Sequence, residues 1–91
     1  MMRKLVTTTQ FRRDAKKHYM ELVSFAWGEV LQKLLTDEEL PEKYKDHQLK
    51  SNLKDFRDCH IKPDLVLMYR KYDEILELVR LGSHSDLGLT T

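Results

Sequence analysis

The 91 residues include only one cysteine, two prolines and three glycines, and they contain no long hydrophobic run. The single cysteine, Cys59, excludes an intrachain disulfide and indicates a reducing compartment, so we expect a cytoplasmic protein. No apolar segment approaches the length that is needed to cross a membrane. The N-terminus is basic but lacks the apolar region of a signal peptide, so we expect no membrane partner.

An excess of charge of one sign is also missing, because the formal net charge is only +1. The overall balance therefore argues neither for nor against nucleic acid as a ligand. The distribution is less even, since residues 1–19 hold six Lys or Arg and one acid, whereas Glu38, Glu39 and Glu42 make the middle acidic. The basic first segment fits a solvated helix face and an RNA-contacting surface equally well.

The length predicts a single domain over residues 1–91, and 41% hydrophobic with 34% charged residues is a globular composition. We expect a strand at residues 4–8, then a helix at residues 10–18 with an N-cap from the threonines at positions 7–9. A second helix is expected at residues 20–35, where apolar residues recur at the spacing of a buried stripe. The members of this stripe are Val23, Ala26, Trp27, Val30, Leu31 and Leu34. Gly28 in this helix is expected to permit close packing against a sheet.

The second half of the chain predicts three consecutive strands. Pro41 marks the end of the helical region, and residues 42–51 are expected to form an exposed connection. Strands follow at residues 53–61, 65–69 and 75–81, with a turn at 62–64, a polar connection at 71–74 and Gly82 at the end. The unbroken apolar run at 65–69 indicates a central strand that is covered on both faces. The order β-α-α-β-β-β predicts an α/β fold of the α+β kind, with an antiparallel sheet and two N-terminal helices on one face.

Three of the four histidines lie in this second half, each beside an acid or an arginine. They occur in the runs Tyr44-Lys45-Asp46-His47, Arg57-Asp58-Cys59-His60 and Arg80-Leu81-Gly82-Ser83-His84. Imidazole is the side chain best suited to proton transfer near neutral pH. Such a set is sufficient to cleave RNA without a metal. One histidine accepts the proton of a ribose 2′-OH, another protonates the leaving 5′-oxygen, and arginine stabilises the charge on the phosphorane.

Strand alternation predicts which of these side chains point the same way. In the strand at 53–61, Asp58 and His60 share one face with Phe56, and Cys59 lies on the other face with Arg57 and Ile61. Arg80 has the parity of Leu76 and Leu78, which leaves open whether it lies on the face of His60. A lone histidine is most often a surface or capping residue, but three with adjacent acids favour a site.

The runs YKDHQL, RDCHIKPDLVLMY and RLGSHSDL, in this order and at this spacing, resemble the YafQ group of bacterial toxins in the RelE superfamily. The FRRDAKK run near the N-terminus also fits, and the resemblance extends over residues 5–87. It implies a microbial RNase-like fold and a small ribosome-associated mRNA endonuclease that an antitoxin holds inactive. The expected partners are then this antitoxin and a ribosome with mRNA in the A site. Operator DNA is expected to be bound only through the antitoxin complex.

The resemblance also implies roles for individual residues. The catalytic set by this comparison is His47, Asp58, His60, Asp64, Arg80 and His84. A 2′-OH attacks its own 3′-phosphate, which leaves a 5′-OH end and a 2′,3′-cyclic or 3′-phosphate end. We expect His84 to protonate the leaving group, and His47 or His60, tuned by Asp58 or Asp64, to act as the base. We assign RNA binding to the basic residues Lys45, Lys50, Lys54 and Arg57.

One position departs from the family pattern. The family usually has a Phe four residues after the last histidine, an aromatic ring that is able to stack on a base. Here that position is Gly88, followed by Leu89-Thr90-Thr91. The departure bears on catalytic strength more than on the fold. Tyr69 and Tyr72 are candidates for stacking instead, although packing in a strand and a turn is the simpler interpretation of both.

Two other functions stay open, and a metal site is not expected. The spacing of His47, His60 and His84 contains no short ligand pair, and Cys59 points away from His60, so we expect no metal and no cofactor. The first alternative function is a catalytically weak member that acts mainly as an antitoxin partner in DNA-bound autorepression. The second is a non-enzymatic α/β interaction module whose histidines only cap loops.

Overall fold

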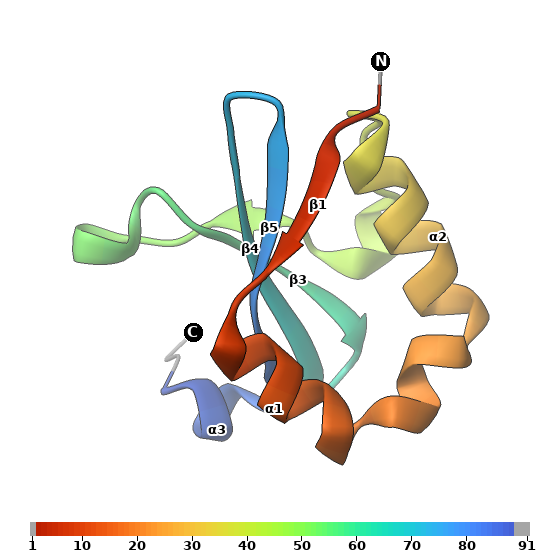
Figure 1. The fold of residues 1–91 in the computed structure, drawn as a ribbon. Helices are drawn as coiled ribbons and strands as arrows, with labels where there is room; N and C mark the ends of the chain where they lie inside the picture. The colour runs from red at the N-terminus through yellow and green to blue at the C-terminus, as the bar shows by residue number, and fades with distance from the viewer. Residues whose placement is uncertain (1, 89–91) are drawn as a thin grey trace.

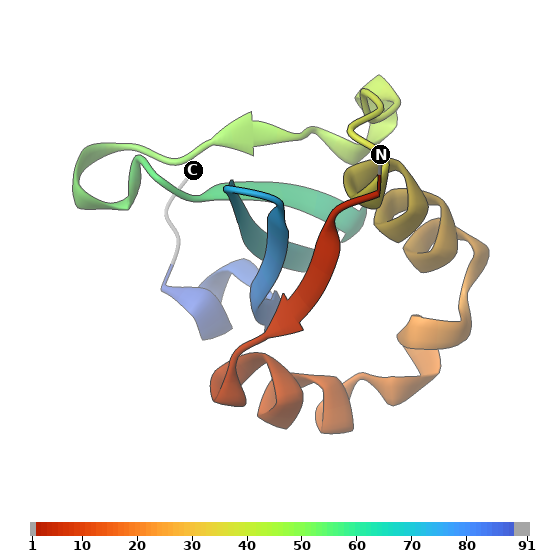
Figure 2. The ribbon, with the colours of Figure 1, turned by 45° about the horizontal axis from the view of Figure 1, so that its top comes forward.

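The computed structural model describes residues 2–88 and contains a five-stranded sheet in the order β1-β5-β4-β3-β2. The elements along the chain are β1 (Lys4–Thr7), α1 (Thr9–Lys17), the 3-10 helix η1 (Tyr19–Val23), α2 (Phe25–Leu35), η2 (Glu42–Tyr44), β2 (His47–Gln48), η3 (Ser51–Leu53), β3 (Arg57–Lys62), β4 (Leu65–Tyr72), β5 (Ile75–Gly82) and α3 (His84–Leu87). Helices α1 and α2 wrap around one side of the sheet, and α3 lies on the opposite side from α2 (Figures 1 and 2). Within residues 2–88, no helix is long and apolar enough to cross a membrane.

Strands β3, β4 and β5 form the predicted antiparallel meander. The residues 65–69 are all buried, as expected for a central strand, and β4 continues beyond them to Tyr72. The first strand differs from the all-antiparallel prediction, because β1 pairs in parallel with β5. No tight turn joins these two strands, so the local sequence does not fix their relative direction.

The helices begin where small polar residues cap them. The Thr8 side chain accepts a hydrogen bond from the Phe11 amide at 2.9 Å, which confirms the predicted N-cap of α1. The second helix begins later than predicted, because Ser24 caps the Trp27 amide and the preceding segment forms the 3-10 helix η1. This break changes the helical phase, so Val23 is 79% exposed and the prediction that it belongs to the buried stripe is wrong.

The core lies between the two helices and one face of the sheet. From α2, Trp27, Val30 and Leu34 are buried and Ala26 and Leu31 pack against them, as the apolar stripe predicted. They meet a sheet face formed by Cys59, Ile61, Leu67, Tyr69, Leu76 and Leu78. Gly28 is exposed, and a Cβ built there would meet nothing within 4 Å, so the expected close packing at this glycine is wrong.

The connection before β3 holds more structure than expected. The predicted strand at 53–61 begins only at Arg57, because Ser51–Leu53 forms the 3-10 helix η3. The predicted exposed connection at 42–51 contains η2 and the short strand β2, and it buries Tyr44, whose hydroxyl donates to Glu29 at 2.5 Å. The predicted connection at 71–74 is reduced to a turn at Asp73–Glu74.

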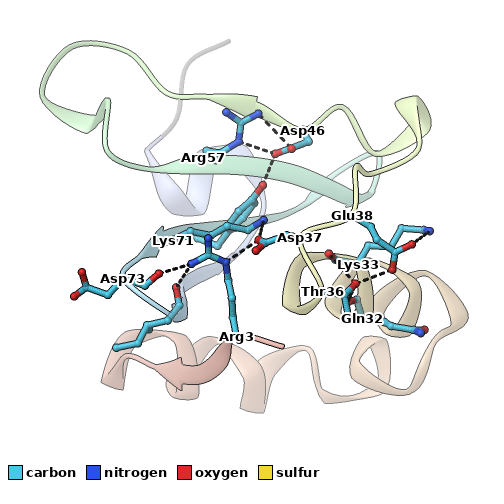
Figure 3. A network of polar contacts seen from close by, with 12 residues as sticks. Arg3, Gln32, Lys33, Thr36, Asp37, Glu38, Asp46, Arg57, Lys71 and Asp73 are labelled. Carbon is cyan, nitrogen blue, oxygen red and sulfur yellow. Dashed lines mark hydrogen bonds and ion pairs between the residues drawn. The ribbon is translucent and has the colours of Figure 1, made fainter. Parts of the chain in front are cut away.

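A polar network anchors the N-terminus. Arg3 Nε donates to Asp37 Oδ1 at 2.7 Å, and Lys71 Nζ donates to the same oxygen at 3.0 Å (Figure 3). Arg3 also donates to the Asp73 carbonyl, so one guanidinium links the residues before β1 to the end of α2 and to the β4–β5 turn. These groups are partly solvated, so their contribution to stability is modest.

The Asp14 carboxylate accepts a backbone hydrogen bond from β5 at the point where the neighbouring strand β1 has ended. Within residues 2–88, β5 has no neighbouring strand on this side after Leu78, the partner of Thr7, and its later backbone groups bond to side chains and to the Thr8 amide instead. Thr8 bonds to the carbonyls of Leu78 and Val79, and the Asp14 carboxylate accepts from the Leu81 amide at 2.9 Å. Burial alone raises the pKa of Asp14, but the Arg80 guanidinium, 2.8 Å away, and the Leu81 amide bring it below its ordinary value.

We predict that Asp14→Ala lowers the free energy of unfolding by about 3 kcal/mol, because it leaves the Arg80 guanidinium and the buried Leu81 amide without their acceptor. Urea denaturation at pH 7 measures the loss. Asp37→Ala is the matched control, since it removes a carboxylate that also pairs with an arginine but is exposed. The control should lose much less. Equal losses in the two variants would contradict the role assigned to Asp14.

Candidate active site

The two faces of β3 have different chemistry. Cys59 and Ile61 belong to the core under the helices, whereas Asp58 and His60 lie on the other face, as strand alternation predicted. Opposite them in register on β4 are Met68 and Val66. The face that carries Asp58 and His60 is therefore the one that the two N-terminal helices do not cover.

Three histidines from different elements meet above this face. Strand β2 places His47 opposite Asp58, with His47 Nε2 3.1 Å from Asp58 Oδ1 and Nδ1 2.8 Å from the Lys45 carbonyl. His84 is the first residue of α3, which the Ser83 side chain caps. The ring centroids of His60 and His84 are 4.9 Å apart, and those of His47 and His60 are 6.5 Å apart.

A cleft of about 790 Å³ opens over these rings. His47, Asp58, His60 and His84 form one wall, and the loop through Leu49, Lys50, Ser51 and Leu53 forms another. Figure 2 shows this loop and α3 on the same side of the sheet. Two of the four predicted RNA-binding residues, Lys45 and Lys50, line the cleft. The other two, Lys54 and Arg57, do not.

Asp58 is the electrostatic centre of the cluster. Its side chain is fully buried, and within residues 2–88 neither carboxylate oxygen has a well-aligned hydrogen-bond partner, despite the short distance to His47. Burial raises the pKa of Asp58, and the positive forms of His47, His60 and His84 oppose that rise. The carboxylate therefore attracts protons toward the three rings and is itself poorly solvated.

The pKa of His60 is shifted in the opposite direction to that of Asp58. Burial lowers the pKa of His60, and a proton on His84 lowers it further, while Asp58 raises it in part. A neutral imidazole therefore stands next to a second imidazole in the same cleft. Two neighbouring imidazoles are suited to a reaction in which one group accepts a proton and another donates one.

Neither Asp64 nor Arg80 lines the cleft, and only Asp64 contacts one of the three histidines. Asp64 Oδ1 is 3.7 Å from His84 Nδ1, and its side chain is 80% exposed. A bulge at Val79 reverses the parity of β5, so Arg80 lies opposite Met68 and not on the face of Leu76 and Leu78. Arg80 therefore lies on the sheet face of Asp58 and His60, which strand alternation alone did not decide. The Arg80 guanidinium nevertheless donates to Asp14 on α1, with Nε at 2.8 Å and Nη2 at 3.3 Å.

Arg57, Tyr69 and Tyr72 contact other side chains outside the cleft lining. Arg57 donates to both oxygens of Asp46, and the Tyr69 hydroxyl donates to the same carboxylate at 2.5 Å (Figure 3). Tyr69 is 1% exposed, so stacking of its ring on a base is excluded and packing is its role. Tyr72 lies near the β4–β5 turn with the Arg70 guanidinium over its ring, and it does not line the cleft.

Gly88 stands at the mouth of the cleft. It lines the cleft, and as the C-cap of α3 it has φ +69°, in the left-handed region that favours glycine. A side chain there would meet nothing within 4 Å at Cβ, but the backbone conformation would cost about 1 kcal/mol or more. The residues Leu89 to Thr91 lie outside the described part of the chain.

Within residues 2–88, no group of three or more His, Cys, Asp or Glu side chains has the arrangement of a metal site. Cys59, which the sequence placed on the opposite face from His60, is fully buried, and burial raises the pKa of its thiol.

Fold and site define a small α+β protein with an acid–base cluster on the open face of its sheet. A family model described as "Bacterial toxin of type II toxin-antitoxin system, YafQ" matches residues 3–89. The match covers nearly the whole chain. The chain therefore belongs to the YafQ family of bacterial toxins.

Individual relatives agree with this assignment. The mRNA interferase toxin YafQ of Escherichia coli is 46% identical over 48 residues, which cover 53% of this chain and 52% of that protein. The chain thus matches about half the length of that curated relative. A copper-bound mutant toxin from Helicobacter pylori is 41% identical, with a TM-score of 0.88 over 94% of this chain and 99% of that one. The toxin in the E. coli DinJ–YafQ complex is 32% identical, with a TM-score of 0.81 over 93% and 97%.

We predict that Asp58→Asn stabilises the protein at pH 7 by about 1–2 kcal/mol, because it keeps the shape of the buried side chain and removes its charge. Since the folded-state pKa of Asp58 is raised, the cost of its charge exists above that pKa. The cost disappears as pH falls below the ordinary carboxyl range. Urea denaturation of both proteins from pH 7 to pH 3.5 measures the difference. A difference that grows on acidification would contradict the assignment.

Proposed function

We propose that this chain is the toxin of a toxin–antitoxin pair and cleaves mRNA on the ribosome by metal-independent acid–base catalysis. The observation that carries the proposal is the grouping of His47, His60 and His84 around the buried Asp58 in an open cleft. The E. coli relative named as an mRNA interferase toxin supports the reaction class. The relative solved in complex with DinJ supports an antitoxin as the partner.

His60 is the best candidate for the general base. Its lowered pKa keeps the ring neutral at pH 7, so it is ready to accept the proton of a ribose 2′-OH. His47 lies between the Asp58 carboxylate and the Lys45 carbonyl, and these two contacts fix its ring. We assign His47 a positioning role, in which its ring pairs with the buried Asp58 carboxylate beside His60.

His84 is the candidate general acid. It stands 4.9 Å from His60 between ring centroids, at the first residue of α3, and Asp64 approaches its Nδ1. In this scheme the 2′-oxygen bonds to phosphorus, the 5′-oxygen leaves, and His84 supplies the proton that makes the 5′-OH end. The two proton transfers therefore use two different rings of the same cluster.

The charge of the phosphorane needs cations. Lys45 and Lys50 line the cleft and supply positive charge to the RNA backbone there. Arg80 lies on the same face as Asp58 but is paired with Asp14 and does not line the cleft, so to act on the phosphorane it has to exchange this partner for the substrate. Lys54 and Arg57 lie away from the cleft lining, so we expect smaller effects on cleavage from replacing them.

A catalytically weak toxin that works mainly through its antitoxin in DNA-bound autorepression is the second candidate. The observation that favours it is Gly88 at the mouth of the cleft, where the family pattern has an aromatic ring. A primer-extension assay on translated mRNA separates the two candidates. Cleavage products that depend on the histidines support the nuclease, and a product pattern identical to that of a protein-free control supports the second candidate.

We predict that His84→Ala lowers the single-turnover cleavage rate on the order of 10²-fold, the usual contribution of a proton-transfer group. His84 lies in a short surface helix outside the core, so thermal unfolding should be nearly unchanged. His18→Ala is the matched control, because this fourth histidine ends α1 outside the cleft. Wild-type kinetics in a folded His84→Ala protein would refute the assignment.

The proposed role of His60 as the base predicts that cleavage slows at acidic pH. The rate should fall on the acidic side as His60 gains its proton, with a midpoint below the value of 6.5 for a free imidazole, because the pKa of His60 is lowered. Single-turnover rates between pH 5 and pH 9 test this, with His18→Ala as the control. An acidic midpoint above 6.5 is incompatible with His60 as the base.

We predict that EDTA leaves the cleavage rate unchanged, because the proposed chemistry uses only side chains of this chain. The copper-bound Helicobacter pylori relative makes this measurement informative. The assay needs a short RNA substrate, or a second metal-independent nuclease on the same ribosomes, as a control for damage to the ribosome. A loss of cleavage that a divalent ion restores, and monovalent salt does not, would count against the mechanism.

A further inference from the structure

A second cavity lies beside the cleft, at the end of β3. Its volume is about 450 Å³, within the range of roughly 300–1,000 Å³ that is usual for small-molecule sites. The start of α2, the end of η2 and the end of β3 contribute its walls. We call this cavity the β3-edge pocket, and the residues that line it include Phe25, Ala26, Lys43, Lys45, His60 and Lys62.

The β3-edge pocket lies across an open edge of the sheet. Strand β2 pairs only with Arg57 and Asp58, so within residues 2–88 no strand covers the rest of β3 on this side. His60 and Ile61 point to opposite faces of β3, and both line the pocket. In Figure 1 the arrowhead of β3 lies toward α2. The pocket therefore leads from the open face of the sheet toward the helices.

The β3-edge pocket and the cleft meet at two shared residues. His60 and Lys45 line both cavities, whereas Phe25 lines only the pocket and His84 lines only the cleft. A single strand of RNA that passes this junction therefore has one nucleotide in each cavity and the phosphate between them beside His60.

The charge of the pocket suits a phosphate. Lys43, Lys45 and Lys62 line it, and among the described residues no Asp or Glu does. Glu29 offsets Lys43 in part across 3.9 Å, and Glu21 pairs with Lys62. Lys45 has no ion pair within residues 2–88, so its charge at the junction is free to act on a phosphate.

Phe25 supplies an aromatic ring that the fold does not use. It is the first residue of α2, yet it is 79% exposed and lies outside the hydrophobic core. An isolated exposed apolar residue is ordinary on a protein surface. This ring, however, lines a cavity that also holds three lysines, and rings beside cations are the surfaces on which single-stranded bases stack.

The roles proposed for the histidines decide which nucleotide enters the pocket. As the base, His60 contacts the 2′-OH of the nucleotide on the 5′ side of the cut. As the acid, His84 contacts the 5′-oxygen of the nucleotide on the 3′ side. Because His60 borders the pocket and His84 does not, the nucleotide with the attacking 2′-OH has the pocket beside it. The leaving nucleotide then lies in the cleft.

We infer that the β3-edge pocket binds the nucleotide on the 5′ side of the cut, with its base stacked on Phe25 and its 3′-phosphate at the junction beside Lys45. The inference rests on the proposed function, because it takes the roles of His60 and His84 from it. It makes Phe25 a specificity-determining residue that lies outside the acid–base cluster.

The first test is single-turnover cleavage of 5′-labelled, ribosome-bound mRNA at increasing toxin concentration. Phe25→Ala should raise the half-saturating toxin concentration about tenfold, the effect of losing one stacked base, and leave the maximal rate nearly unchanged. Phe25→Trp should restore wild-type saturation because it keeps an aromatic ring. Tyr19→Ala is the matched control, since Tyr19 is also an exposed aromatic residue but lines neither cavity, and it should behave as wild type.

The second test identifies the nucleotide that contacts Phe25. Removing the base on the 5′ side of the cut should weaken binding of the mRNA by wild-type toxin about tenfold and have little further effect in Phe25→Ala, because both changes remove the same stacked pair. Removing the base on the 3′ side should weaken binding by both proteins equally. Coupling of Phe25 to the 3′ base, and not to the 5′ base, would overturn the assignment.

Two further outcomes separate the inference from the proposed function. Wild-type saturation in Phe25→Ala would overturn the inference, while cleavage that still depends on His84 would leave the proposed function intact. A variant that cleaves as wild type but binds the product of the adjacent gene more weakly would assign Phe25 to a protein partner and overturn the nucleotide site. Absence of cleavage by the wild-type protein would overturn both.

Discussion

The hydrogen-bond register of the meander β3–β4–β5 sets the position of every other part of this molecule. It places Cys59 and Ile61 under the helices and Asp58 and His60 on the open face. The bulge at Val79 moves Arg80 to the open face while Leu78 and Leu81 both stay in the core. A slip of one residue would exchange these faces, burying a charged cluster and exposing the apolar core, so the apolar residues enforce the arrangement of the site.

The buried carboxylate of Asp58 shows how stability and chemistry oppose each other here. A domain of this size has a small hydrophobic core and a correspondingly small free energy of unfolding. It nevertheless buries the Asp58 carboxylate without a well-aligned hydrogen bond, which is destabilising. Its charge acts on three imidazoles at once, and burial strengthens that action because little water screens it. Asp14 is the contrasting case, since the Leu81 amide and the Arg80 guanidinium satisfy its carboxylate and make it a structural group.

The cleft and the pocket beside it share Lys45 and His60. Lys45 has a left-handed backbone conformation with φ +50°, which turns the chain from η2 toward β2 and brings its carbonyl to His47. The same turn thus orients a histidine and forms the boundary between the two cavities.

The sequence by itself determined the α+β class, the three-strand meander, the cap of α1 and the face shared by Asp58 and His60, because these features follow from local periodicity and capping. It also indicated the family, through three histidine segments in a fixed order. It did not determine the parallel pairing of β1, the short strand β2, the late start of α2 or the exposure of Val23. Only the tertiary structure showed that Arg80 lies on the open face and forms an ion pair with Asp14. It also showed that Arg57 forms an ion pair with Asp46. A bulge shifts parity, and an ion pair joins residues 66 positions apart, so neither leaves a signal in the local sequence.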